Sequence, residues 1–369
     1  MAEHSNEYLA EVVSQFDISG NLEEIVPYGT GHINDTYASK IKTGNGIIRF
    51  IHQRMNHTIF KEPERLMRNI ERVTAHLREK VLSAGGNPQR NVLTIVPTTS
   101  GQSFIHDNRG NYWRTYVFIE GARTYDIIEN LDHITNASRA FGEFQKHLAD
   151  LPGKRLHETI PDFHDTKKRF DTFIRTLEKD PVNRAADVRS EIDFATNRQK
   201  DTEIIVNLMN TEKIPERITH NDTKFNNIMI DDQTGKGVCV IDLDTVMPGS
   251  VLYDFGDSVR IGASTAAEDE RDLSKVSISL DMFDRLARGY LESAGAFLAP
   301  EEIRHLAFSA KLLTLECGIR FLTDHLDGDN YFKVHRENHN LDRCRTQFKM
   351  VADMEKKMEE MMRIIETYS

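Results

Sequence analysis

Residues 219–227 read THNDTKFNN, and this segment contains the spacing His-x-Asp-x4-Asn at His220, Asp222 and Asn227. Phosphoryl transfer from a nucleoside triphosphate requires a carboxylate that orients the attacking hydroxyl and accepts its proton. It also requires a neutral oxygen ligand for magnesium on the same loop. Asp222 and Asn227 have the residue types and the spacing for these two roles. The segment therefore favours a fold that brings a nucleotide to this loop.

A second segment, VCVIDLDTV, follows at 238–246. Its apolar part at 238–241 predicts a short strand, and Asp242 stands at the end of that strand. A carboxylate there can hold a magnesium ion that bridges the nucleotide phosphates, since magnesium prefers oxygen ligands and takes few of them from protein. We therefore expect Asp222 to be the catalytic base, and Asn227 and Asp242 to be metal ligands.

Each of these residues also has a simpler interpretation. A His-x-Asp pair occurs often by chance, and an aspartate at a strand end is commonly a turn former or a helix cap. The combination is more informative, because Asn227, the strand before Asp242 and a strand-rich segment upstream occur together. We therefore favour catalysis over a structural role for Asp222.

The first third of the chain has a pattern typical of a sheet, in which short β-rich runs are separated by the turn-forming residues Gly, Asn, Pro or Asp. These runs lie at 23–28, 36–41, 46–53, 92–96 and 112–120. Between the third and fourth runs, apolar residues at helical spacing predict a helix over 63–81. After Gly121 the pattern becomes helical, with amphipathic helices expected around 131–148, 283–291, 303–317 and 354–365. The sequence thus predicts a boundary near Gly121.

Charge and cysteine content narrow the class of protein. The 58 acidic and 47 basic residues give a net charge of -11, which argues against a nucleic-acid partner. The three cysteines form no CxxC pair, so neither a zinc site nor a disulfide framework is predicted. The N-terminus does not resemble a secretory signal, and no run approaches the ~18 apolar residues of a membrane helix. We expect a cytoplasmic protein that binds no membrane.

Five phrases together resemble a known family. They are YGTGHINDTY, HNDTKFNN, VIDLDTVMPG, LYDFGDS and GIRFLTDHLDGDNYF. Over roughly residues 25–345, the chain resembles the aminoglycoside-phosphotransferase and choline-kinase-like branch of the protein-kinase-like fold. Within that branch it is most similar to bacterial N-acetylhexosamine kinases, which phosphorylate the anomeric hydroxyl of the sugar.

The resemblance implies an α+β, two-lobed fold. A small antiparallel-sheet lobe, 1–120, would bind the nucleotide, and a larger, mostly helical lobe, 121–369, would carry catalysis and the substrate. The implied reaction is direct in-line transfer of the γ-phosphate of ATP, with Mg²⁺, to the C1 hydroxyl of an N-acetylhexosamine. His220 would brace the catalytic loop and Asp254 would stabilise it through hydrogen bonds. A monomer is expected, without excluding an oligomer.

The phosphate contacts in the small lobe follow a partial pattern. Gly29 and Gly31 lie between two predicted strands, where a glycine turn can bring backbone N–H groups to phosphate, although an ordinary hairpin turn would look the same. Protein kinases place a lysine in the third strand, whereas this strand reads IIRFIHQRMN. Gln53 and Arg54 stand near the lysine position on opposite strand faces, and Arg54 would keep the charge. The partner carboxylate would be Glu64 or Glu71.

The last strand of the small lobe, YWRTYVFIEG, runs into Gly121 and would serve as the hinge. Backbone groups around Phe118, Ile119 and Glu120 would bond the adenine edge. A buried strand would have the same sequence.

The acceptor contacts are expected at His32, Asn34, Asp244, Arg320 and Tyr331. Arg320 would repel a polycationic aminoglycoside but can donate hydrogen bonds to sugar hydroxyls or an acetamide carbonyl. Its structural alternative is a surface pair with Asp324. Two other functions stay open: a kinase of choline, homoserine, thioribose or an aminoglycoside, or a binding protein without catalysis.

Overall fold

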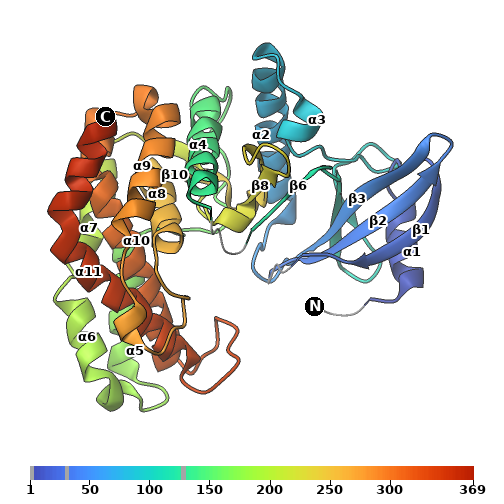
Figure 1. Cartoon of the computed structure of the whole chain (residues 1–369). Coiled ribbons are helices and arrows are strands. Elements are labelled where there is room, and N and C mark those ends of the chain that lie inside the picture. Colours follow the sequence, from blue (N-terminus) through green and yellow to red (C-terminus); the bar gives the residue numbers. More distant parts are fainter. Residues whose placement is uncertain (1–3, 30–32, 126–129) are drawn as a thin grey trace.

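Five antiparallel strands form the sheet of the N-terminal lobe in the computed structural model, which describes residues 4–29, 33–125 and 130–369. Their order is β1-β2-β3-β5-β4, and their bounds are β1 Asn21–Pro27, β2 Asp35–Thr43, β3 Gly46–Met55, β4 Ile105–His106 and β5 Tyr112–Val117. Helix α1 (Asn6–Ser14) lies against this sheet (Figure 1). Its residues Tyr8, Leu9 and Val12 share an apolar cluster with Trp113 of β5.

One predicted strand is wrong. Residues 92–96 follow the short helix α3 (Pro88–Asn91) and contribute a single bridge, from Ile95 to Tyr116. The fifth strand is β4 instead. The run is rich in β-forming residues, which favours a strand, and Val92 and Val96 are indeed buried. Pro97 follows at once, however, and has no N–H to extend a ladder.

Helix α2 (Pro63–Ser83) begins and ends within two residues of its expected bounds. Its buried stripe, Leu66, Ile70, Val73 and Leu77, belongs to the same apolar cluster as the core of the helical lobe. Proline suits the start of this helix, because the N–H that it lacks would have no partner in the first turn of any helix. The division at residue 121 stays a prediction, since this helix packs across it.

The C-terminal lobe is a helical assembly in which α9 packs on α4, α11 on α10 and α10 on α8 (Figure 1). The helices are α4 Leu131–Leu148, α5 Thr166–Lys179, α6 Arg189–Thr196, α7 Asp201–Asn210, α8 Val251–Gly262, α9 Leu280–Ala294, α10 Pro300–Leu326 and α11 His339–Tyr368. Short 3-10 turns occur at η1 Ala185–Val188, η4 Leu273–Lys275 and η5 Gly295–Phe297. Of the helices in the described residues, none has both the length and the apolar character to span a membrane.

Two small sheets lie between the larger elements and carry the polar segments of the sequence. Strands β6 (Ala122–Arg123), β8 (Ile228–Asp231) and β9 (Gly237–Val240) form one, and β7 (Arg217–Thr219) pairs with β10 (Met247–Gly249) in the other. The 3-10 turns η2 (Phe225–Asn227) and η3 (Leu243–Thr245) follow β7 and β9. The ends of β7 and β9 therefore deliver the two acidic segments.

Candidate active site

The register between β8 and β9 brings the two acidic segments together. Ile228 pairs with Val240, and the amide of Ile241 donates to the carbonyl of Asn227 at 2.9 Å. Asp242 follows directly and has a left-handed backbone, φ 56°. Aspartate tolerates this conformation better than most residues, and the turn directs the chain away from the strand. Asn227 and Asp242 are therefore neighbours in space.

The carboxylate of Asp222 is held on one side by two donors. Its Oδ2 accepts from Nδ2 of Asn227 at 3.1 Å and lies 3.0 Å from Nζ of Lys224. Burial acts to raise the pKa of Asp222, but Lys224, His220 and the hydrogen bond from Asn227 together hold that pKa below its ordinary value. Asp222 is therefore ionised at neutral pH and can orient a hydroxyl group.

Asp242 has a different electrostatic environment. Burial, followed by repulsion from Asp244 and Asp222, raises the pKa of Asp242 to about 6. Its side chain nevertheless opens to solvent, so an incoming cation can reach it. Adjacent carboxylates that repel one another are a favourable environment for a divalent cation.

The donor set fits Mg²⁺ of the kind that retains water and phosphate ligands. Asn227 and Asp242 offer an amide oxygen and a carboxylate, the hard ligands that Mg²⁺ prefers. Among the described residues, no group of three or more His, Cys, Asp or Glu side chains is arranged to hold a metal ion. The nucleotide phosphates would have to supply further ligands.

The catalytic loop is braced from beneath by Asp254 at the start of α8. Its carboxylate accepts from the amides of His220 at 2.8 Å and Asn221 at 2.6 Å, and burial raises its pKa. The ring of His220 is fully buried, lies 5.6 Å from Phe141 and bonds the carbonyl of Ile241 at 2.9 Å. The bracing contacts expected of His220 and Asp254 are confirmed.

A buried arginine, which the sequence reasoning missed, connects the sheet to this site. Arg114 of β5 donates to Oδ1 of Asp244 at 2.5 Å, and its other nitrogens donate to Gln53 at 3.0 and 2.8 Å. Burial acts to lower the pKa of Arg114, but Asp244 and neighbouring acidic groups raise it. The pair therefore stays charged.

The expected substrate contacts Asp244 and Asn34 are engaged within the protein. Asn34 donates to Oδ2 of Asp244 at 2.7 Å and accepts from the amide of Asn56 at 3.0 Å. Both side chains are at least nine-tenths buried. As a correction, Asp244 is a junction between Arg114 and the glycine-turn segment, with no surface left for a sugar.

The expected phosphate contact at Arg54 is also wrong. Arg54 bonds Asp35 at 2.8 Å and pairs in register with Trp113, so it lies on the sheet face that α1 covers. Gln53 points the other way, towards Arg114. A strand alternates its faces, and the apolar cluster of Trp113 fixes which one is inward. Glu64 and Glu71 are both exposed and form no ion pair with a described residue.

The glycine turn is described only in part. Gly29 has φ 77°, a left-handed conformation that suits glycine, and a Cβ there would meet no atom within 4 Å. Gly31 and His32 lie outside the described residues. Tyr28, beside Gly29, lies edge-on to Phe118 at 5.6 Å, so the turn and the expected hinge are adjacent.

The segment expected to be the hinge is held by two arginines. Arg90 donates to the carbonyls of Glu120 at 3.3 Å and Gly121 at 2.8 Å. Arg49 lies 3.6 Å from the centre of the Phe118 ring and bonds the exposed side chain of Glu120. Ile119 is 5 % exposed and packs in a cluster with Met229 and Cys239. The adenine contacts expected at 118–120 stay a prediction.

The structure brings the expected acceptor residues Arg320 and Tyr331 together around the ring of Phe332. Arg320, in α10, lies 5.5 Å from the ring centres of Phe163 and Phe332, and the Tyr331 ring is 4.8 Å from that of Phe332. The ion-pair partner of Arg320 is Glu316, at 3.9 Å. The alternative partner, Asp324, instead accepts from the amides of Tyr331 and Phe332.

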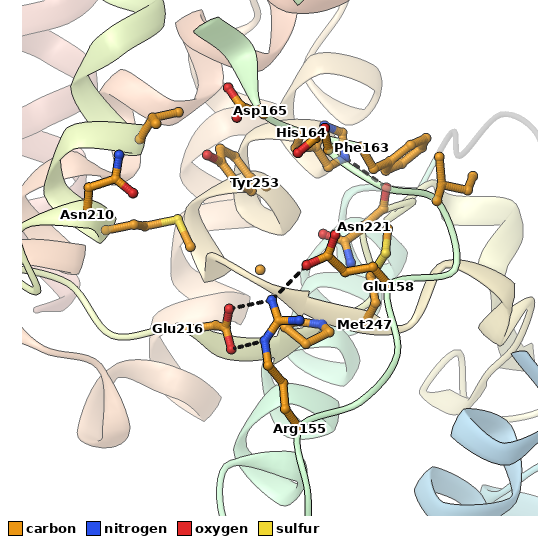
Figure 2. Close-up of a pocket in the computed structure, with 16 residues that line it drawn as sticks. Arg155, Glu158, Phe163, His164, Asp165, Asn210, Glu216, Asn221, Met247 and Tyr253 are labelled. Atoms are coloured by element: carbon orange, nitrogen blue, oxygen red, sulfur yellow. Dashed lines mark hydrogen bonds and ion pairs between the residues drawn. The ribbon is translucent and has the colours of Figure 1, made fainter. Parts of the chain in front are cut away.

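A cavity of about 270 Å³ lies behind the catalytic loop (Figure 2). Asn221 and Gly249 form part of its wall, and Asp222 is not among the lining residues. Figure 2 shows His164 bonded to Asn221 on one side, and Arg155 between Glu158 and Glu216 at the other.

Two functional candidates were overlooked in the sequence. Lys224 stands two residues after Asp222 inside the quoted motif, so proximity alone would have indicated it. Arg114 lies in YWRTYV, and a charged residue inside an otherwise apolar strand is the signal that could have identified it. A buried arginine requires a partner, but its partner is 130 residues away and only the fold identifies it.

Comparison with known proteins agrees with this geometry. A sequence model of the phosphotransferase enzyme family matches residues 24–303. Similar solved structures include a microcompartment-associated aminopropanol kinase, with 14% identity, TM-score 0.59, 97% of this chain and 98% of that chain covered. A spectinomycin phosphotransferase in complex with ADP and spectinomycin has 10% identity, TM-score 0.58 and coverages of 98% and 100%. An ethanolamine kinase of Plasmodium vivax has 16% identity and TM-score 0.52, with 87% of this chain and 80% of that chain covered.

The structural likenesses establish the fold, which is the protein-kinase-like arrangement that the sequence predicted. The match to the family model covers well over half of the chain and includes the catalytic loop and Asp242. The chain belongs to the phosphotransferase enzyme family.

Proposed function

We propose that the protein is an ATP-dependent kinase that transfers the γ-phosphate to the anomeric hydroxyl of an N-acetylhexosamine. The observation that carries the transfer chemistry is the convergence of Asp222, Asn227 and Asp242 from two segments joined by the β8–β9 ladder. Asp222 would orient the hydroxyl and accept its proton, while Asn227 and Asp242 would hold Mg²⁺. Mg²⁺, when bound, would neutralise charge on the phosphates.

The transfer would be direct. A hemiacetal hydroxyl is more acidic than an ordinary alcohol, so a weakly basic carboxylate such as Asp222 suffices to orient it. Positioning and charge neutralisation supply most of the rate enhancement in this chemistry. In this proposal residues 1–120 bind the nucleotide, and the acceptor enters against residues of 121–369.

Lys224 would provide the cation that the third strand lacks. Its Nζ bonds Asp222 at 3.0 Å, and its charge also acts on Asp242. A terminal ammonium that pairs with Asp222 and acts on Asp242 would be well placed to meet a transferring phosphoryl group. Arg114 would contribute indirectly, by holding Asp244 and the segment after Asp242 in place.

The charge near Arg320 favours a neutral acceptor over an amine. Arg320 lies close enough to Arg169 to act on it: burial first, and then the charge of Arg320, lowers the pKa of Arg169. His164 adjoins the same carboxylate, Glu316, as Arg320. An ammonium group would be repelled by these positively charged side chains, whereas sugar hydroxyls and an acetamide carbonyl can accept hydrogen bonds from them.

The cavity behind the loop offers no ready site for an ammonium group either. Its four carboxylates already have cationic partners among the described residues. Glu158 and Glu216 pair with Arg155 at 2.9 and 2.7 Å, and Asp162 and Asp165 pair with Lys168 at 2.6 and 3.3 Å. A choline or aminoglycoside kinase would need unpaired carboxylates.

The test is a phosphotransfer screen with ATP and Mg²⁺. The acceptors are N-acetylglucosamine, N-acetylgalactosamine, plain hexoses, choline, ethanolamine and aminoglycosides, and phosphorus NMR locates the ester. We expect a sugar 1-phosphate that the Asp222→Asn variant does not produce. Phosphorylation of an amine with no product from any sugar would overturn the acceptor assignment.

A further inference from the structure

His164 links the catalytic loop to helix α10 by a hydrogen bond from each ring nitrogen. Nε2 lies 3.0 Å from the carbonyl oxygen of Asn221, the residue before Asp222 (Figure 2). Nδ1 lies 3.0 Å from Oε1 of Glu316. His164 and Glu316 are 8 % and 2 % exposed, so both groups are largely shielded from bulk water. The ring also lies 5.3 Å from that of Tyr253.

The chemistry of the two partners determines the protonation of the ring. A backbone carbonyl only accepts hydrogen bonds, and so does an ionised carboxylate. A neutral imidazole has one N–H, so it can satisfy one of these acceptors and would oppose the other with a lone pair. Both bonds can form only if His164 carries a proton on each nitrogen, as an imidazolium.

The other arrangement would place that proton on Glu316, which would donate to a neutral ring. Arg320 and Arg169 both act on Glu316 and favour its ionised form, and Asp257 adds negative charge near His164. Burial acts to lower the pKa of His164, but Glu316 and the other partners raise it overall. The carboxylate and imidazolium pair is thus the favoured state.

His52 provides a contrast within the same chain. It is also fully buried, but its nitrogens bond the hydroxyls of Ser39 at 2.8 Å and Thr115 at 2.9 Å. A hydroxyl can donate or accept, so these partners suit a neutral ring. The two histidines should therefore differ in protonation although both are buried.

We propose that His164 is a positioning residue whose imidazolium fastens the peptide before Asp222 to Glu316, and so sets the catalytic loop relative to the acceptor-side helix α10. The role for the acceptor rests on the proposed function. Because Glu316 also pairs with Arg320, one carboxylate then orients both the loop and the expected acceptor arginine. The second oxygen of Glu316, Oε2, is buried without a hydrogen-bond partner among the described residues.

The protonation is measured by imidazole nitrogen NMR on the full chain labelled with ¹⁵N-histidine, at pH 8 and without substrate. The signals of His164 and His52 are assigned by the variants His164→Gln and His52→Gln. We expect two N–H nitrogens for His164 and one for His52. A neutral His164 would overturn the proposal. This readout needs no acceptor, so its outcome is separate from that of the proposed function.

The positioning role is measured by kinetics with the best acceptor of the screen. Misplacement of a catalytic group by ~1 Å costs about 100-fold in rate, so we expect His164→Gln to lower kcat by about that factor with the KM for ATP unchanged. Glu316→Gln keeps a neutral partner for each ring nitrogen, so its kcat should fall less while the acceptor KM rises through Arg320.

His52→Gln is the matched control, because it removes a buried histidine that touches no part of the site, and its kcat per folded molecule should match the wild type. Thermal unfolding of each variant separates loss of folded protein from loss of rate. A folded His164→Gln variant with wild-type kcat would overturn the positioning role. A drop in kcat equal to that of His52→Gln would do the same.

Discussion

Arg114 and Asp244 form a buried ion pair across the two lobes, with 130 positions of sequence between them. Their side chains are 1% and 3% exposed. The pair does not stand alone, because Gln53 accepts from Arg114 and Asn34 donates to Asp244. The Lys–Glu pair of protein kinases joins a strand to a helix, whereas here strand β5 is joined to the segment after Asp242, the proposed metal ligand.

Breaking this pair should destabilise the fold strongly. Removal of one partner of a buried ion pair leaves an uncompensated charge and typically costs about 3–5 kcal/mol. We expect Arg114→Met and Asp244→Asn each to lower the free energy of unfolding by about that amount, and the double variant to lose clearly less than the sum. Urea unfolding followed by fluorescence of Trp113, the single tryptophan, measures this. Additive losses would contradict the pairing.

Local signals account for what the sequence predicted. The catalytic loop, strand β9 and helix α2 are each specified by residues within a short window, so spacing alone located Asp222, Asn227 and Asp242. The sheet face of Arg54, by contrast, depends on which side Trp113 and α1 cover. Asp244 likewise looked available because its partners Arg114 and Asn34 are far away in sequence. These assignments require the tertiary fold.

Lys224 should act on the chemical step. If its ammonium meets the transferring phosphoryl group, Lys224→Met should lower kcat by about 100-fold, the usual loss when one donor to transition-state charge is removed. Lys236→Met is the matched control, since Lys236 is an exposed lysine in the turn between β8 and β9 and should leave kcat unchanged. Steady-state kinetics with saturating ATP distinguish the two. Equal rates for both variants would show that Lys224 only pairs with Asp222.

Arg320 should decide the class of acceptor. Arg320→Glu replaces the cation beside Phe163 and Phe332 with an anion, so we expect loss of sugar phosphorylation and a gain for amine acceptors such as choline. Arg304→Glu, an exposed position on the same helix α10, is the charge-matched control and should keep the wild-type preference. The ratio of kcat/KM for sugar and amine is the measurement. An unchanged ratio in Arg320→Glu would remove Arg320 from the acceptor site.

The N-terminal lobe should be sensitive to acid through His52. Burial lowers the pKa of His52 from 6.5 to about 4. Between these values the unfolded chain binds a proton that the folded chain excludes, so stability falls as pH falls through this window. The shift corresponds to about 3 kcal/mol between neutral pH and pH 4. The unfolded state drives this loss, because its imidazole is free to become charged.

The variant His52→Gln isolates this contribution, since glutamine can bond Ser39 or Thr115 but does not titrate. At pH 7 the variant should be less stable than the wild type, because it packs less well between β2 and β5. As the pH is lowered to 4, the gap in free energy of unfolding should shrink by up to about 3 kcal/mol. Only the wild type loses stability through protonation of His52 in the unfolded chain. Urea unfolding of both proteins at several pH values, followed by Trp113 fluorescence, measures the gap. A gap that is constant between pH 7 and pH 4 would mean that His52 binds its proton in the folded lobe as readily as in the unfolded chain.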